Sequence, residues 1–327
     1  SYGMSGKVFH APFLHTHPDF VFSAVTERSK KLAHERYPNV KSYDSVDDLI
    51  NDPELELVIV NTPNFTHYEY ATKALQAGKH VLIEKPVAVT SAEARELFLL
   101  SKRTGKQLLV YQNRRYNSDY QSLKQVLESG KLGKLIDVSF RYDRYRLAIG
   151  AKYFKEEPYP GSGLSYDLGP HLLDQAISLF GKPASFRKTL GKNRPGTQTD
   201  DYVFMHLSYE NGLQVYLFAS LLVAKALPSY VVNGVEGTFI KDRTDTQEDQ
   251  LLAGMMPGDE GFGVEKSNQE GVLTLRYEDG TEHEELIPSL TADYSQLFDD
   301  VYASIREGKP YPVNEEQVIW QLEILES

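Results

Sequence analysis

The chain has 327 residues, of which 41% are hydrophobic and 25% charged, carries a formal net charge of −11, and contains no cysteine. This length exceeds the size at which one hydrophobic core stops growing, so we expect two domains in a globular protein of ordinary composition. The negative charge disfavours nucleic acids and anionic membranes as partners, and the lack of cysteine excludes disulfides, thiolate metal ligands and a cysteine nucleophile.

Short apolar runs and helical patterns alternate through the first part of the chain. The continuous apolar run LELVIVNTP at 55–63 is typical of a strand buried on both faces. The segment at 66–78 predicts a helix, because Thr66 and Glu69 form a capping-box pattern and Gly78 provides a stop. Further strands are expected at 20–25, 80–86 and 107–113, and further helices at 45–52, capped by Ser45, and at 91–105. This alternation predicts crossover units, hence a doubly wound parallel sheet with helices on both faces.

After residue 113 the pattern changes. The segment at 135–145 alternates apolar and polar side chains, as a half-buried strand does. The strands that follow are joined by turn signals, which favours a large, mostly antiparallel sheet in an α+β domain. Those strands are expected at 202–210, 213–222, 229–233 and 271–278, and helices at 120–133 and 170–181. We therefore predict one domain at 1–115 and a second at 116–327, and the family resemblance described below implies that the second serves substrate binding and oligomerisation.

Both ends of the sequence suggest a longer native chain. Residues 1–12 have the composition of a turn that follows a strand, yet no strand precedes them. The helical pattern at 317–327 stops without a cap, and this last helix is expected to pack on the first domain. We therefore expect the first strand of the parallel sheet to be missing. The sequence shows no signal peptide and no apolar stretch of membrane-spanning length, so we expect a cytoplasmic protein without a membrane partner.

The opening S-Y-G-M-S-G follows the G-x-G-x-x-G pattern of dinucleotide-binding turns, except that Ser1 replaces the first glycine. Gly3 would let a pyrophosphate approach the backbone, with Met4 and Ser5 beside it, and Gly6 would let the following helix pack closely. The alternative is a simple glycine-rich turn without a ligand.

The second strand ends in VTERSKK at 25–31. A carboxylate such as that of Glu27 binds the adenosine ribose hydroxyls of NAD, whereas Arg28, Ser29 and Lys30 suit the 2′-phosphate of NADP. Three groups suited to phosphate against one carboxylate favour NADP(H), with NAD(H) still possible. The alternative is that these residues form the solvated start of a helix.

Two more strands end in polar residues, at the edge of the sheet where open parallel sheets bind their ligands. The KHVLIEKP segment is unusual because a lysine is costly to bury at the end of an apolar strand, so it either lies on a rim or has a function. At this edge we expect cofactor contacts from Asn61, Thr62, Pro63, Asn64, Glu84, Lys85 and Pro86, and also from His67, whose more ordinary role is to begin a helix.

The second domain contains GSGLSYDLGPHLLDQ at 161–175, in which Asp167 and His171 are four residues apart. An aspartate can fix the tautomer of a neighbouring histidine, and histidine is well matched to proton transfer near neutral pH. A zinc site would need a third ligand and usually a fourth, and none is evident beside this pair. We therefore expect no metal.

Three motifs together resemble the glucose–fructose oxidoreductase/inositol dehydrogenase (Gfo/Idh/MocA) family. They are V-N-T-P-N-F-T-H at 60–67, E-K-P at 84–86 and G-x-G-x-x-Y-D-x-G-x-H at 161–171. The segments at 2–13, 113–119 and 166–181 are most similar to its NADP-dependent scyllo-inositol 2-dehydrogenase branch. The resemblance covers nearly the whole chain and departs from the family pattern at Ser1. It implies a Rossmann domain followed by an α/β domain whose open sheet often packs against a partner subunit, hence a homodimer or homotetramer.

By position, the resemblance makes Lys85 the catalytic lysine and Asp167 and His171 its catalytic partners. It implies hydride transfer between a nicotinamide and a secondary alcohol of a cyclitol or sugar, with scyllo-inositol as the leading substrate. The alternatives are another sugar, or a cofactor-binding regulator that has lost catalysis. Polar side chains near the crevice are candidate ligands of the polyol hydroxyl groups, although paired arginines after a strand are as often structural. These candidates are Arg115, Asn117, Asp119, Tyr142, Arg144 and Tyr166, together with Asp167 and His171. The polar, glycine-rich stretch at 242–263 is a lid, an oligomer contact or a mobile loop without a role.

Overall fold

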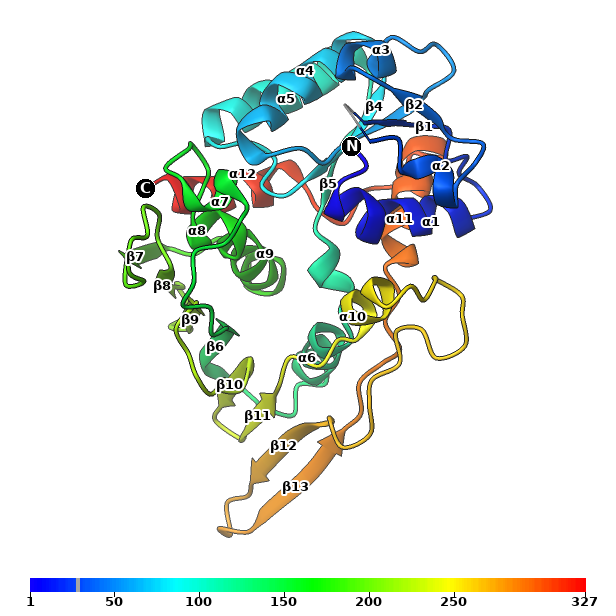
Figure 1. Ribbon diagram of the computed structural model, residues 1–327. Coiled ribbons are helices and arrows are strands. Elements are labelled where there is room, and N and C mark those ends of the chain that lie inside the picture. The colour runs from blue at the N-terminus through cyan, green and yellow to red at the C-terminus, as the bar shows by residue number, and fades with distance from the viewer. Residues whose placement is uncertain (28–29) are drawn as a thin grey trace. The chain divides into compact units, whose positions relative to one another are not determined.

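A computed structural model describes residues 1–27 and 30–327 (Figure 1). The described chain divides into two compact units, and each is discontinuous in sequence. Unit 1 comprises Ser1–Asn113, Gln247–Phe262 and Asp293–Ile319, and unit 2 comprises Arg114–Thr246, Gly263–Ala292 and Trp320–Ser327. The stretch at 242–263 is not one loop, because it contains the helix α10 (Gln247–Leu252).

Unit 1 is built on parallel strands, as the alternating pattern predicted. β4 (His80–Glu84) lies between β3 (Leu57–Val60) and β5 (Leu108–Tyr111), and its residues Val81, Leu82 and Ile83 are fully buried. The helices that follow β3 and β4 pack against each other (Figure 1). Each of these strands therefore ends at the same edge of the sheet.

The first two strands form a separate parallel pair. β1 (Ala24–Thr26) pairs with β2 (Lys41–Tyr43) and not with β3. A cavity of about 570 Å³ is lined by residues of both β1 and β3. The described strands of unit 1 form two parallel groups, because none of them bridges β1 and β3, where the sequence predicted a missing strand.

Two helix starts in unit 1, those of α3 (Val46–Ile50) and α5 (Ser91–Thr104), follow local capping rules. Ser45 caps α3, since its hydroxyl accepts a hydrogen bond from the N–H of Asp48 at 3.0 Å. The capping box predicted at Thr66 is wrong, because its hydroxyl donates to the carbonyl of Pro63 at 2.7 Å. The capping box is found instead at Thr90 and Glu93, at the start of α5.

The remaining elements of unit 1 connect and cover these strands. The π-helical turns are η1 (Gly6–His10) and η4 (Ala303–Glu307), and the 3₁₀ turn is η2 (Asn64–Thr66). The helices are α1 (Ala11–Thr16), α2 (Ala33–Arg36), α3 (Val46–Ile50), α4 (His67–Gln76), α5 (Ser91–Thr104) and α11 (Ser295–Tyr302). The 3₁₀ turn η3 (Asn113–Tyr116) and α12 (Glu315–Glu326) contribute residues to both units.

Unit 2 contains a large mixed sheet with the strand order β13-β12-β11-β10-β6-β9-β8-β7. β6 (Leu135–Asp143) and β9 (Gln214–Ser220) are parallel, and the other neighbouring pairs are antiparallel. The mostly antiparallel sheet expected from the sequence is therefore confirmed. The other strands are β7 (Ser185–Gly191), β8 (Tyr202–Ser208), β10 (Tyr230–Gly234), β11 (Gly237–Lys241), β12 (Gly271–Arg276) and β13 (Glu282–Ile287).

The two faces of this sheet differ in burial. Along β8 and β9 every second residue is buried, which places Met205 and Leu217 in the core. α9 (Gly169–Phe180) packs against β9. The helices of unit 2 are α6 (Ser118–Glu128), α7 (Tyr153–Glu156), α8 (Leu164–Asp167) and α9. Across the described residues, no helix is both long enough and apolar enough to span a bilayer.

Candidate active site

The glycine-rich turn of unit 1 leads directly into η1. A Cβ atom on Gly6 would lie 2.1 Å from the carbonyl oxygen of Ser1, so only glycine fits here without a backbone shift. The amide of Asn61, just after β3, donates to the same carbonyl oxygen at 2.9 Å. Gly3 and Met4 are exposed, and a Cβ on Gly3 would meet its nearest atom at 3.9 Å. The exposed half of the turn therefore has room for a ligand beside the backbone, as a pyrophosphate requires.

The carboxylate of Glu84 connects this turn to the end of β4. The hydroxyl of Ser5 donates to its Oε1 at 2.6 Å, and Nε2 of His10 lies 2.9 Å from the same oxygen. Burial favours the neutral acid, but the hydrogen bond and charge of His10, the Ser5 hydroxyl and the charge of Lys85 outweigh it. Together they lower the pKa of Glu84 to about 2. Glu84 is thus a half-buried, ionised group within the site.

Lys85 and Pro86 follow β4 at the carboxyl edge of the sheet, and Lys85 is half-buried. His67 is fully buried between two carbonyl groups, with Nδ1 2.7 Å from the oxygen of Pro86 and Nε2 2.9 Å from that of Thr62. Burial lowers the pKa of His67, so the ring is neutral and its single N–H can serve one carbonyl at a time. His67 therefore connects the ends of β3 and β4 and lies away from any ligand surface, whereas the neighbouring Asn64 is half-buried.

The end of β1 carries Glu27, whose side chain is buried. Its carboxylate accepts hydrogen bonds from the N–H of Leu32 at 2.8 Å and of Ala33 at 3.3 Å, and from the hydroxyl of Ser42 at 2.9 Å. Glu27 thus satisfies donors at the start of α2, and both of its oxygens are engaged. Lys30 is exposed, and the predicted phosphate ligands Arg28 and Ser29 lie outside the described residues.

In unit 2, the loop before α8 is shaped by Gly163 and Asp200. Gly163 has φ +88°, and a Cβ there would lie 2.2 Å from Oδ1 of Asp200. Asp200 accepts from the N–H of Ser165 at 2.6 Å and from its hydroxyl at 3.0 Å, which satisfies the first turn of α8. This turn sets the direction of α8, which carries Tyr166 and Asp167.

Asp167 and His171 lie on consecutive helices, because α8 ends at Asp167 and α9 begins at Gly169. Nζ of Lys155 donates to Oδ1 of Asp167 at 2.5 Å. The ring of Tyr142 on β6 lies 6.2 Å from that of His171, measured between centroids. Burial lowers the pKa of Arg144, and the nearby charge of Asp167 opposes that shift. In unit 2, Lys155 and Arg144 therefore lie near the half-buried Asp167 carboxylate, and Tyr142 lies near His171.

The segment at 113–119 lies mostly in the interior, where it makes structural contacts. Arg115 forms a bidentate ion pair with Asp174, at 2.8 Å through Nε and 2.7 Å through Nη2. Asp119 is fully buried and accepts from the N–H groups of Thr244 at 2.8 Å and Asp245 at 3.0 Å. Asn117 is also fully buried. This geometry favours the structural alternative for the segment, so our proposals omit these three residues from the polyol site.

Several side chains in these sites were not identified from the sequence. They are His10, Lys155, Glu156, Arg194 and Asp200. Only His10 belongs to a motif that the sequence singled out, the segment at 2–13. The others contact residues far away in the sequence, and such contacts leave no local pattern. Among the described residues, no cluster of three or more His, Asp or Glu side chains is placed to hold a metal ion.

Comparison with known proteins identifies both parts of the chain. Residues 2–112 match the family described as "Oxidoreductase family, NAD-binding Rossmann fold", and residues 124–327 match "Oxidoreductase family, C-terminal alpha/beta domain" (GFO_IDH_MocA). The chain is 36% identical to the oxidoreductase YdgJ of Escherichia coli, over 99% of this chain and 92% of that protein. It is 35% identical to the scyllo-inositol 2-dehydrogenase (NADP(+)) IolW of Bacillus subtilis, over 100% of this chain and 90% of that protein. The solved structure of the oxidoreductase yvaA from Bacillus subtilis matches with a TM-score of 0.95 and 34% identity, over 100% of this chain and 92% of that one.

Proposed function

Because the chain belongs to the Gfo/Idh/MocA family of NAD(P)-binding oxidoreductases, we propose that it is an NADP(H)-dependent dehydrogenase of cyclitols or sugars, with scyllo-inositol as the leading substrate. The observation that carries the proposal is the presence of Lys85 at the carboxyl edge of the parallel sheet together with Asp167 and His171 at the junction of α8 and α9. The likeness to IolW, which is named for scyllo-inositol and NADP(+), supports the choice of substrate and cofactor.

The residues present fit a dinucleotide. The exposed turn at Gly3 and Met4 would lie along the pyrophosphate, and Asn61 to Asn64 with Lys85 would lie near the nicotinamide end. A bound nicotinamide cofactor would supply the hydride acceptor for oxidation of the alcohol carbon and the hydride donor for the reverse reaction. The half-buried Glu84 carboxylate holds the turn and the end of β4 together through its bonds to Ser5 and His10.

Three side chains would carry the chemistry of the alcohol. The ammonium of Lys85 would hydrogen-bond the reacting oxygen and stabilise its negative charge while the carbonyl forms. His171 would take the hydroxyl proton, which a histidine can do near neutral pH. Asp167 would accept a hydrogen bond from a neighbouring hydroxyl or orient His171. In the reductive direction the proton returns from His171 to the oxygen.

The environment of Glu27 supports NADP over NAD. A carboxylate that recognises the ribose of NAD must offer free oxygens to the two hydroxyl groups. Here the carboxylate already accepts hydrogen bonds from Leu32, Ala33 and Ser42. The positive side chain of Lys30 is exposed at the same strand end and suits a phosphate.

We also propose that the chain assembles through the outer face of its large sheet, as a homodimer or homotetramer. This face carries aromatic side chains of β8 and β9, including Phe204 and Phe218, whose ring centroids lie 4.9 Å apart and which are only half-buried. Partly exposed aromatic surface on a sheet is typical of protein interfaces. Light scattering on wild type and Phe204→Glu tests this: the wild type should be an oligomer, and the variant should shift to lower mass.

The direct test of the activity is a substrate panel with both nicotinamides. Purified enzyme is given scyllo-inositol, myo-inositol, D-glucose or D-xylose with NADP⁺ or NAD⁺, and absorbance of the reduced cofactor is followed. We expect the highest kcat/KM with scyllo-inositol and NADP⁺. A preference for glucose or xylose would keep the reaction class and change the substrate. Cofactor binding without turnover of any polyol would contradict the proposal and favour a regulator.

A further inference from the structure

Lys155 reaches Asp167 from a separate segment of unit 2. It lies on α7, twelve residues before Asp167, and its ammonium is 2.5 Å from Oδ1. The side chains of Lys155 and Asp167 are 37% and 25% exposed. Both side chains are therefore partly accessible to a ligand while they remain paired with each other.

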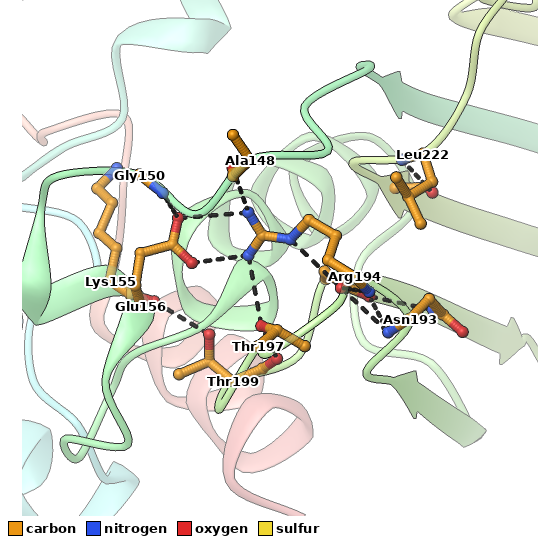
Figure 2. A network of polar contacts seen from close by, with 11 residues as sticks. Ala148, Gly150, Lys155, Glu156, Asn193, Arg194, Thr197, Thr199 and Leu222 are labelled. Carbon is orange, nitrogen blue, oxygen red and sulfur yellow. Dashed lines mark hydrogen bonds and ion pairs between the residues drawn. The ribbon is translucent and has the colours of Figure 1, made fainter.

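The segment that carries Lys155 is anchored by a buried arginine (Figure 2). Arg194 is 4% exposed, and its guanidinium donates to Oε2 of Glu156 at 2.7 Å and to the carbonyl of Ala148 at 3.3 Å. Its Nε donates to Oδ2 of the buried Asp201 at 3.3 Å. A guanidinium offers five N–H donors in one plane, so Arg194 can hold several acceptors at fixed positions.

Glu156 and the backbone of Lys155 complete this anchor. The N–H of Gly150 donates to Oε1 of Glu156 at 2.9 Å. Burial favours the neutral acid, but the Arg194 and Gly150 hydrogen bonds keep the pKa of Glu156 below its usual value. The carbonyl of Lys155 accepts from the hydroxyl of Thr199 at 3.2 Å (Figure 2). The same carbonyl accepts from the N–H of Gly163 at 3.2 Å. The backbone at Lys155 is therefore fixed from both sides.

This anchor is more than an ordinary surface ion pair requires. Exposed lysine–carboxylate pairs contribute about 0–1 kcal/mol and need no buried support. Here the segment of Lys155, which meets Asp167, is held by a buried arginine, two carboxylates and four backbone groups. Binding sites need side chains held in place by such supporting contacts.

We propose that Lys155 is a substrate-binding and positioning residue, which pairs with Asp167 to recognise two neighbouring hydroxyl groups of the polyol. This inference rests on the proposed function and adds a residue to its site. An ammonium only donates hydrogen bonds and an ionised carboxylate only accepts them. Side by side, the Asp167 carboxylate accepts a hydrogen bond from one hydroxyl, and the Lys155 ammonium donates one to the oxygen of the next. Arg194 and Glu156 act through Lys155 by holding α7 in place.

The test compares Lys155→Met with Lys155→Arg and with a matched control, Lys131→Met. Lys131 also forms a 2.5 Å ion pair in unit 2, with Glu285, and the two side chains are 44% and 37% exposed. Kinetics are measured with scyllo-inositol, myo-inositol, D-glucose and D-xylose. Lys155→Met should raise KM for the polyol about tenfold or more with a smaller change in kcat, because it removes a binding contact. Lys155→Arg should restore most of the affinity, and Lys131→Met should match wild type.

A double-mutant cycle tests the role of the anchor. Glu156→Gln should raise KM in the same direction as Lys155→Met but by less. If the anchor acts through Lys155, the double variant should be no worse than Lys155→Met alone. Additive losses would overturn the positioning role. Thermal melting of every variant checks that the fold is retained.

The outcomes separate this inference from the proposed function. A wild type that turns over a polyol, with a Lys155→Met variant whose KM is unchanged, overturns the role of Lys155 alone. If calorimetry shows that the wild type binds a polyol without turnover, the proposed activity fails. Weaker polyol binding by Lys155→Met would then still support this inference, and unchanged binding would overturn it. If the wild type neither binds nor turns over any of the four polyols, both proposals fail.

Discussion

The hydroxyl of Ser5 lies 2.6 Å from Oε1 of Glu84, so one half-buried carboxylate links the glycine-rich turn to the end of β4. The same oxygen lies 2.9 Å from Nε2 of His10. Lys85 follows Glu84 directly, and its backbone position therefore depends on this network. The network gives Glu84 a structural role next to the proposed catalytic lysine.

Replacing Glu84 with glutamine should change the pH dependence of stability. The folded pKa of about 2 lies below the ordinary value of 4.5, so the Glu84 charge stabilises the fold above pH 4.5, and this stabilisation is lost as pH falls toward 2. The shift corresponds to about 3 kcal/mol. Urea unfolding at several pH values should show wild type more stable than Glu84→Gln at pH 7, with the gap closing below pH 4.5. A gap that stays constant with pH would contradict the ionised state of Glu84.

The two glycines of the turn should respond differently to alanine. Gly6→Ala places a Cβ 2.1 Å from a backbone oxygen, and such overpacking costs about 1–3 kcal/mol. Gly3→Ala meets only an atom at 3.9 Å, so it should leave the melting temperature unchanged. It should nevertheless weaken NADPH binding, measured by fluorescence titration, because its methyl group would obstruct the pyrophosphate. Unchanged NADPH affinity in Gly3→Ala would argue against a cofactor at this turn.

Breaking the ion pair of Arg115 and Asp174 should destabilise the fold. Arg115→Met leaves the buried Asp174 charge without its arginine and should cost about 3–5 kcal/mol in urea unfolding. The double variant Arg115→Met/Asp174→Leu removes both charges and should recover most of this loss. If Arg115 bound the substrate, Arg115→Met would instead raise KM for the polyol, and the double variant would not recover it. That outcome would place Arg115 in the polyol site.

The cofactor preference should depend on the residues after Glu27 more than on Glu27 itself. Arg28→Ala should weaken NADP⁺ far more than NAD⁺ in kcat/KM, because an arginine there would face the 2′-phosphate. Glu27→Gln should lower the melting temperature, since an amide nitrogen in place of Oε2 cannot accept from the N–H of Ala33 or the hydroxyl of Ser42, but should keep the NADP⁺ to NAD⁺ ratio. An equal loss for both cofactors in Arg28→Ala would refute the NADP assignment.

The sequence predicted the elements whose own pattern is strong. The apolar runs of β3, β4 and β5 and the alternation in β6, β8 and β9 each indicate a strand by themselves. β7 and β13 were missed because most of their residues are exposed and polar, as in the EHEELI segment of β13. Their strand conformation comes from pairing with β8 and β12, which a local pattern does not record.

The candidate site residues also divide into those that a local sequence pattern indicates and those that it does not. Lys85, Asp167 and His171 could be proposed from the sequence because each belongs to a short motif. The supporting contacts were not, since Arg194 meets Glu156 from 38 residues away and Ser5 meets Glu84 from 79 residues away. Asp119 and Arg115 have residue types suited to binding a polyol, and a structural role is indicated by their burial and by contacts that the sequence does not record.

The most direct test of the central claim is hydride transfer by Lys85→Met. This variant keeps the length of the side chain and removes the ammonium that is proposed to stabilise the reacting oxygen. With scyllo-inositol and NADP⁺, kcat should fall about 10³-fold while NADPH binding by fluorescence stays close to wild type. A variant that keeps kcat within about tenfold of wild type would contradict the catalytic role of Lys85 and the mechanism built on it.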